Sequence, residues 1–303
     1  MKLNKILLRY SITAFVLCFV ILCSVIFSSS VGALTVKENS DGLTISPLRS
    51  EMNIAPGTSL SGVLKITNST NKVMVVDLNA DEFSIVNQQY DYAFSKESGI
   101  SKWVTFSSQQ INLSIGETRE ISYIIGVPLS AEPGGRYISL FASTGVKSKT
   151  GDTNSIQRVA SLLYITVTGD VSRSGRLVSL SSPWAFGGES KWAMSVQNTG
   201  TTHFHSLYSV SIQSIFDKKS IASLSGNSLI LPDTIRTLSN DIPVPQLPGI
   251  YRIIFTIGLG DSPASIQTRY ILYLPLISAL IITIIIISVI TLFYYRYLRK
   301  KSN

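Results

Sequence analysis

Two histidines come closest in this sequence to a catalytic or metal-binding pattern. His203 and His205 are separated by one residue, so on a β-strand they point to the same side and could share a metal ion. A structural zinc site needs a full set of protein ligands, and the chain beyond Ala33 contains no cysteine to complete one. We therefore expect no metal and no cofactor, and we interpret the pair as the solvated end of a strand.

A second pattern with chemical potential is Ser69-Thr70-Asn71-Lys72, which matches the Ser-x-x-Lys motif of serine acylases. In that class the motif opens a helix, whereas here it separates two strand-like runs and is typical of a hairpin turn. A Ser-His-Asp site would have to use His203 or His205, and the sequence has no nucleophile elbow, phosphate loop or dinucleotide fingerprint. We predict that the protein is not an enzyme and has no catalytic residues.

The tryptophans are the candidate contact residues. Trp103 and Trp184 stand beside loop-forming residues, so either is a candidate for an exposed binding aromatic or for a core residue. Trp192 lies within a strand-like run, and for this residue the sequence favours the core. Beyond Trp103 and Trp184 the sequence does not identify binding residues.

The formal net charge of +8 is concentrated at the two ends of the chain. Of 26 Lys and Arg residues, 7 lie in the terminal segments 1–33 and 296–303, which contain no Asp or Glu. The remaining 19 face 18 acidic residues, which leaves the middle of the chain at about +1. This distribution does not support nucleic-acid binding.

The N-terminus has the composition of an export signal. Residues 6–27 form an apolar run behind a basic start, and Val31-Gly32-Ala33 offers small residues for cleavage after Ala33. An uncleaved signal anchor is the alternative, and it also exports the chain. Cys18 and Cys23 both lie inside this run, each behind a leucine rather than a small residue, so we expect neither lipidation nor disulfides in the exported part.

The C-terminus contains a predicted membrane span. Residues Ile271 to Tyr295 contain no charge, and a helix of this length covers about 37 Å, enough for a hydrocarbon layer of roughly 30 Å. The basic tail, 296–303, is expected in the cytoplasm by the positive-inside rule. We therefore predict a single-pass plasma-membrane protein with residues 34–270 outside the cell.

The external part has the pattern of an all-β protein. It lacks sustained helical periodicity and shows short alternating runs separated by Gly, Pro, Asn and Ser. The clearest runs are Val63–Ile66, Val73–Leu78, Ile121–Ile124, Tyr137–Phe141, Leu162–Val167 and Trp192–Gln197. We predict two tandem immunoglobulin-like β-sandwiches, residues 34–170 and 171–270, followed by a transmembrane helix over 271–295.

The second half of this region repeats turn motifs of the first. The strand that ends at Asn68 resembles the one that ends at Asn198, and Gly116-Glu117-Thr118 corresponds to Pro232-Asp233-Thr234. Pro133-Gly134-Gly135 likewise corresponds to Pro248-Gly249-Ile250. Either a duplication or the turn chemistry common to β-sandwiches accounts for this.

Several first-domain motifs carry a family resemblance. They are Ile45-Ser46-Pro47-Leu48, Ala55-Pro56-Gly57-Thr58-Ser59, Leu64-Lys65-Ile66-Thr67-Asn68-Ser69-Thr70, Ile115-Gly116-Glu117-Thr118 and Val127-Pro128. With the order signal, β-domain, β-domain, span and basic tail, the chain resembles the WxL-interacting cell-surface proteins of Gram-positive bacteria. The resemblance implies a peptidoglycan-binding first domain and a second domain for a partner protein or host ligand.

These observations favour a non-enzymatic binding or adhesion protein of the cell surface. Its expected partners are a cell-wall polymer or a surface protein, together with membrane lipid around the C-terminal helix. One alternative is a membrane-tethered assembly factor that exchanges a strand through an open sheet edge, as pilus chaperones do. Another is a cell-envelope enzyme with a site that no motif reveals, and it predicts a deep polar pocket.

Overall fold

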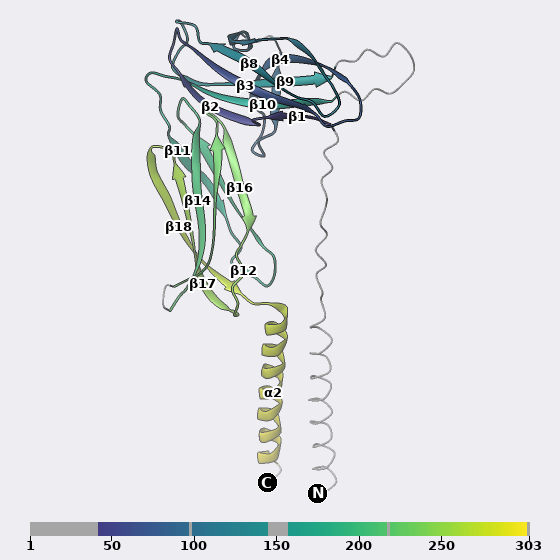
Figure 1. Cartoon of the computed structure of the whole chain (residues 1–303). Coiled ribbons are helices and arrows are strands. Elements are labelled where there is room, and N and C mark those ends of the chain that lie inside the picture. Colours follow the sequence, from purple (N-terminus) through teal and green to yellow (C-terminus); the bar gives the residue numbers. More distant parts are fainter. Residues whose placement is uncertain (1–41, 97–98, 145–156, 217–218, 302–303) are drawn as a thin grey trace. The chain divides into compact units, whose positions relative to one another are not determined.

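The structure is a computed structural model that describes residues 42–96, 99–144, 157–216 and 219–301. The predicted signal segment and its cleavage site at Ala33 lie outside these residues. Within them the chain forms four β-sheets followed by one long helix (Figure 1).

The first two sheets make up the first sandwich. One sheet has the order β1 (Leu43–Ser46), β3 (Ser59–Asn68), β8 (Thr118–Gly126), β6 (Val104–Phe106). The other has the order β2 (Arg49–Ile54), β10 (Arg158–Val167), β9 (Gly134–Thr144), β4 (Met74–Ile85), with β5 (Tyr92–Ser95) and β7 (Gln110–Leu113) both paired to β4. A short 3-10 helix, η1 (Ser101–Trp103), precedes β6.

Period-two alternation explains why these segments are strands with one buried face. In β8, Ile121, Tyr123 and Ile125 are buried while the residues between them are exposed. Their side chains join Leu64 and Ile66 of β3 in the core between the sheets. Apolar burial at about 25 cal/mol per Å² holds the layers together, because residues 34–303 contain no cysteine for a disulfide.

The other two sheets make up the second sandwich. One has the order β11 (Gly175–Ser181), β13 (Lys191–Asn198), β16 (Ile235–Asp241). The other has the order β12 (Ala185–Phe186), β18 (Ser262–Tyr273), β17 (Gly249–Leu259), β14 (Phe204–Ser214), β15 (Ser220–Ile230). The core is lined by alternate residues of β13 and β17, with Trp192 and Phe255 as its largest fully buried side chains.

Both sandwiches follow one connectivity plan at their first strands. In the first, β1 joins one sheet and β2 then pairs in parallel with β10, the last strand. In the second, β11 joins one sheet and β12 pairs in parallel with β18, again the last strand. The motifs that the sequence repeats thus lie in corresponding places of two similar folds.

Two buried asparagines close equivalent turns in the two sandwiches. Asn68 donates from its side-chain amide to the carbonyls of Lys72 and Leu113, at 2.7 and 3.2 Å. Asn198 donates in the same way to Thr202 and Ile230, at 2.9 and 2.8 Å. Both asparagines are 0% exposed, and these bonds satisfy buried or partly buried carbonyls.

The β4–β5 turn of the first sandwich contacts the second sandwich directly. The backbone N–H of Leu231 donates to the Tyr90 hydroxyl at 2.8 Å, and this hydroxyl lies 2.7 Å from that of Thr234. The Arg236 guanidinium lies 4.3 Å from the centre of the Tyr90 ring. Tyr90 is buried and belongs to the same apolar cluster as the core of the second sandwich, so the two sandwiches share part of their core.

The C-terminal helix α2 (Leu276–Lys301) follows β18 after two residues (Figure 1). Within the described residues it is the one helix long and apolar enough to cross a membrane, over Leu276–Tyr294, with mean hydropathy 3.0. Its side chains are not buried against the rest of the protein. Composition and length are those of a single transmembrane span.

The predicted all-β class with one C-terminal helix is confirmed. The predicted start of the span at Ile271 is not what the structure shows: Ile271 is a buried residue of β18, and the helix begins at Leu276. The uncharged run from Ile271 to Tyr295 contains the end of β18 and most of α2. Both segments are apolar, because β18 ends in the protein core and α2 has the composition of a membrane span. At its other end the helix passes through Tyr295 and ends at Lys301.

Candidate functional site

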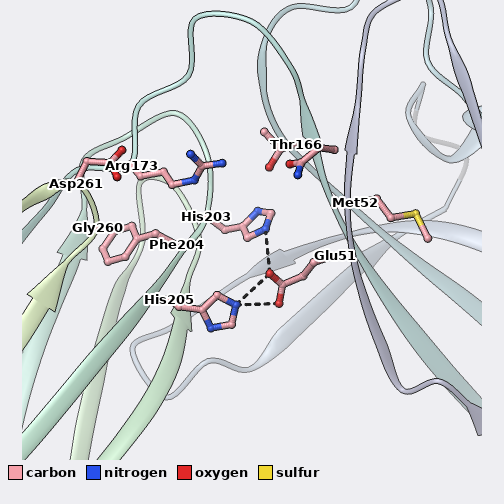
Figure 2. A pocket seen from close by; sticks show the side chains of 10 residues that line it. Glu51, Met52, Thr166, Arg173, His203, Phe204, His205, Gly260 and Asp261 are labelled. Atoms are coloured by element: carbon pink, nitrogen blue, oxygen red, sulfur yellow. Dashed lines mark hydrogen bonds and ion pairs between the residues drawn. The ribbon is translucent and has the colours of Figure 1, made fainter.

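A pocket of about 360 Å³ lies where β2 of the first sandwich meets the start of β14 (Figure 2). Its walls carry charged and polar side chains from five separate segments of the chain. The lining residues are Glu51, Met52, Asn53, Thr166, Arg173, His203, Phe204, His205, Gly260 and Asp261. The pocket therefore gathers both histidines that the sequence singled out.

Both imidazoles face the carboxylate of Glu51, as Figure 2 shows. His205 Nε2 lies 2.9 and 3.0 Å from the two oxygens, and its other ring nitrogen lies 3.1 Å from Oδ1 of Asn227. His203 Nε2 lies 3.9 Å from the carboxylate, and its ring packs edge-on against Tyr137 and Tyr164. The prediction that the two side chains share one side is correct, but His203 is buried rather than solvated.

Burial determines the charge of this cluster. Desolvation lowers the pKa of His203 to about 4, and the nearby carboxylate of Glu51 only partly opposes it. For Glu51, burial raises the pKa, but the hydrogen bond and charge of His205, with Arg49 and His203, outweigh burial and lower it. At neutral pH the contact between His203 and Glu51 is therefore no ion pair, and the Glu51 carboxylate is held by His205.

This geometry predicts a loss of stability in acid. Unfolded His203 takes up a proton near its ordinary pKa of 6.5, whereas folded His203 resists protonation down to about pH 4. The unfolded state binds more protons in that window, so stability is complete above pH 6.5 and falls by roughly 3 kcal/mol towards pH 4. Guanidinium unfolding of the full chain in detergent, followed by tryptophan fluorescence at several pH values, measures this slope.

The matched variants for this experiment are H203Q and M52L, both in the same pocket. H203Q removes the titrating group and is expected to flatten the slope between pH 6.5 and 4, whatever its stability at neutral pH. M52L keeps the histidine and is expected to keep the slope. An unchanged slope in H203Q would assign the acid sensitivity to another group.

The cluster does not have the arrangement of a metal centre. Across the part of the chain that the structure describes, no group of three or more His, Cys, Asp or Glu side chains is placed to hold a metal ion. Ser69 to Lys72 lie in the turn between β3 and β4, but these strands belong to different sheets, so the turn connects the two layers and the predicted hairpin is wrong. The pocket connects the two β-sandwiches through the contact between Glu51 and His205.

The three tryptophans fall into three different environments. Trp192 of β13 is 1% exposed and lies in the core, as predicted. Trp103 of η1 is partly buried and packs against the core of the first sandwich. Trp184 is 79% exposed in the segment before β12, which leaves it as the binding candidate among the three.

The second candidate site is the free edge of β15. This strand has 11 residues, and within the described part of the chain it pairs only with β14, with a bulge at Ile221. The sequence Ser-Ile-Ala-Ser-Leu-Ser-Gly-Asn-Ser-Leu-Ile contains neither a charge nor a proline. Lys, Pro, short length and bulges are the usual means of blocking an edge, and from Ala222 to Ile230 β15 has none of them.

The other sheet edges in the described residues are short, charged or interrupted, and these include β2 with Arg49 and Glu51 and β5 with 4 residues. The terminal strands β1 and β6 have 4 and 3 residues. In the second sandwich, β11 carries Arg176 and a bulge, and β16 carries Arg236 and Asp241. The long strand β18 is covered by β12 at Leu272 and Tyr273 only, but the rest of it contains Pro263 and Arg269.

The solvent-facing side of β15 is lined with small polar residues. Ser223, Ser225 and Asn227 are exposed there, and Ile221 is the one larger side chain. On the other face, Tyr208 of β14 covers Gly226, where a Cβ would lie 2.3 Å from the tyrosine side chain. The edge is thus sterically open and firmly attached to its own sheet.

Comparisons with known proteins give likenesses of structure alone. No protein-family model matches this chain, and no curated protein matches it. The solved structure "Crystal Structure of Class 5 Fimbriae Chaperone CfaA" has a TM-score of 0.43 and 12% identity over 78% of this chain and 100% of that one.

Two further solved structures give similar values. "Salmonella enterica SafA pilin in complex with the SafB chaperone" has a TM-score of 0.39 and 11% identity over 77% of this chain and 96% of that one. "Crystal structure of Pseudomonas aeruginosa CupB2 chaperone" has a TM-score of 0.34 and 9% identity over 75% of this chain and 99% of that one. At these values the likeness does not assign a function, and the proposal below depends on the residues of this chain.

Sequence reasoning missed Glu51 and β15. Glu51 is 154 positions from His205, and no local motif marks it. The strand β15 is rich in serine and weakly apolar, so its alternation is faint. Its one available signal was the uncharged stretch from Ser220 to Leu231, bounded by Lys219 and Pro232.

Proposed function

We propose that this chain is a non-enzymatic, membrane-anchored surface protein that binds a partner protein by adding a strand of the partner to the free edge of β15. The observation that supports the proposal is the length of this edge together with its lack of charge, of proline and, among the described residues, of a second paired strand. Strand addition supplies affinity through main-chain hydrogen bonds and needs no reactive side chain.

The location of the binding edge follows from α2 and the ends of the sequence. A span over Leu276–Tyr294 with a basic tail behind it keeps the tail in the cytoplasm and both sandwiches outside. The partner is therefore a protein of the cell surface or envelope. This is the strand-exchange mode of the assembly-factor alternative, carried out by a chain that is itself fixed in the membrane.

The partner must present an extended, unpaired segment with few charges. A strand added beside β15 lies in the same layer as β14, above the opposite layer, where Leu238 is buried and Ser239 to Asp241 are exposed. Apolar side chains on the inner face of the added strand would extend the sandwich core. Small serines on the outer face offer no steric barrier to it.

Introducing positive charge on the edge tests the proposal. In S223K/S225K, lysine takes the place that it has on edges of natural sheets, and we expect capture of the partner to weaken by roughly tenfold or more. The measurement is retention of surface-extract proteins by the immobilised full chain in detergent, quantified by mass spectrometry.

A matched control lies directly opposite in the same sheet. Ser211 and Ser209 of β14 pair with Ser223 and Ser225, and β14 has neighbours on both sides. S209K/S211K adds the same charge to the same face without touching the edge, so we expect it to retain the partner like the parent. Equal loss in both double variants, or no loss in either, would contradict strand addition at β15.

The family resemblance adds a different proposal, peptidoglycan binding by the first sandwich. It stays a prediction that the same experiment separates, by offering purified peptidoglycan in place of surface extract. If the parent and S223K/S225K both retained peptidoglycan and neither captured a protein, strand addition would be wrong and peptidoglycan binding by the first sandwich would take its place.

A further inference from the structure

Three large apolar side chains are exposed at one end of the second sandwich. Trp184, Phe216 and Leu247 are 79%, 91% and 70% exposed, and they come from three separate loops. Together we call them the apolar rim. Large apolar residues that gather from separate loops at one place mark an interaction surface rather than chance exposure.

Strand pairing places all three at the end where β18 leaves the sandwich. The N–H of Leu272 in β18 donates to the carbonyl of Trp184 at 2.9 Å. The hydroxyl of Tyr251 donates to the carbonyl of Leu247 at 2.6 Å, and Tyr251 pairs with Ile271 of β18. Tyr251 also pairs with Ser214, whose hydroxyl accepts the N–H of Phe216 at 3.2 Å.

Only two residues separate this end from α2. β18 ends at Tyr273 and the helix begins at Leu276, so the chain between them spans about 10 Å at most. The N–H of Leu274 donates to the carbonyl of Phe186 at 2.9 Å, which fixes the first linker residue to β12. The rim must therefore lie close to the first turn of the helix, whatever angle the helix adopts.

We propose that the apolar rim is a lipid-binding surface that inserts Trp184, Phe216 and Leu247 into the interfacial layer of the bilayer that α2 spans. This inference rests on the membrane anchoring in the proposed function. Lipid is the occupant that the short linker brings to this surface. Trp and Tyr side chains have the apolar body and polar tip that favour the interface, and Tyr270 at the end of β18 adds one such side chain to Trp184.

Insertion of the apolar rim fixes the orientation of the second sandwich relative to the membrane. Transfer of three large apolar side chains from water into the bilayer is favourable, and it adds to the attachment that α2 already provides. The sandwich is then attached to the bilayer through its own loops as well as through the short linker to α2. This holds the β15 edge at a set height above the lipid, since β15 follows the loop that carries Phe216.

Depth-dependent fluorescence quenching in lipid tests this inference on the full chain. The background carries C18A/C23A, and single cysteines for a fluorescent label are introduced as F216C, L247C, I285C and L207C. Ile285 is the midpoint of the apolar helix segment Leu276–Tyr294, and Leu207 is a similarly exposed leucine towards the other end of β14. The protein is reconstituted into phosphatidylcholine vesicles with bromine either near the headgroup or near the end of the acyl chain.

We expect the labelled positions to lie at different depths in the bilayer. Labels at F216C and L247C lose fluorescence most with bromine near the headgroup, the label at I285C loses most with bromine near the chain end, and L207C is unaffected. Quenching of I285C while F216C and L247C behave like L207C would overturn the rim and leave the anchor intact. Absence of quenching at I285C would overturn the anchor itself, and the rim with it.

Discussion

The variant N198A is expected to be less stable than the parent by roughly 3–6 kcal/mol. Asn198 is 0% exposed and makes three hydrogen bonds: it donates to the carbonyls of Thr202 and Ile230, and its oxygen accepts the N–H of Gly200 at 2.8 Å. Alanine leaves these partners buried and unsatisfied, at about 1–3 kcal/mol each. Chemical unfolding of the full chain in detergent measures the difference.

The variants N68A and N227A are the comparisons for the stability loss of N198A. Asn68 occupies the equivalent turn of the first sandwich, but several of its bonds lie in partly buried surroundings, so we expect a smaller loss. Asn227 is exposed on the β15 edge, where its Oδ1 lies 3.1 Å from His205 Nδ1, and N227A should change stability by less than about 1 kcal/mol. If N198A were as stable as N227A, the buried turn would not contribute as described.

The variant W192A is expected to lose about 3–5 kcal/mol, the usual cost of deleting a large aromatic side chain from a core. Trp192 packs against Tyr208 and Phe255, with ring centroids 5.6 and 6.0 Å away. Its indole nitrogen has no hydrogen-bond partner among the described residues. W192F, which keeps an aromatic ring and removes that nitrogen, should therefore lose much less than W192A.

The matched control is W184A, at an exposed position of the same sandwich. In detergent it should unfold with nearly the parent midpoint, because Trp184 has little contact with the core. Thermal unfolding followed by far-UV circular dichroism suits all three variants, since it does not depend on the tryptophans themselves. Equal losses in W192A and W184A would contradict the assignment of one residue to the core and the other to the surface.

The sequence predicted the strands well where one face of a strand is apolar. Ile121 to Ile124 and Trp192 to Gln197 alternate clearly, because one side of each meets the core and the other meets water. The start of the span was misplaced because Ile271 to Tyr273 are apolar as the buried end of a strand. Composition does not distinguish side chains buried in protein from side chains buried in lipid.

The candidate sites depend on contacts that a linear pattern does not contain. The spacing of His203 and His205 predicted their common side, but the carboxylate that both face comes from β2 of the other sandwich. The free edge of β15 is a property of sheet order, because a strand is exposed only when no later segment pairs with it. Three-dimensional pairing was needed to find both.

The contact of Tyr90 has a practical consequence for work with fragments. Its hydroxyl satisfies the N–H of Leu231, the residue that follows β15, so the first sandwich completes the hydrogen bonding of the second. A shortened chain starting after β10 would keep that buried N–H without a partner beside the strand under study. Surveys for interacting molecules should therefore use both halves together as bait.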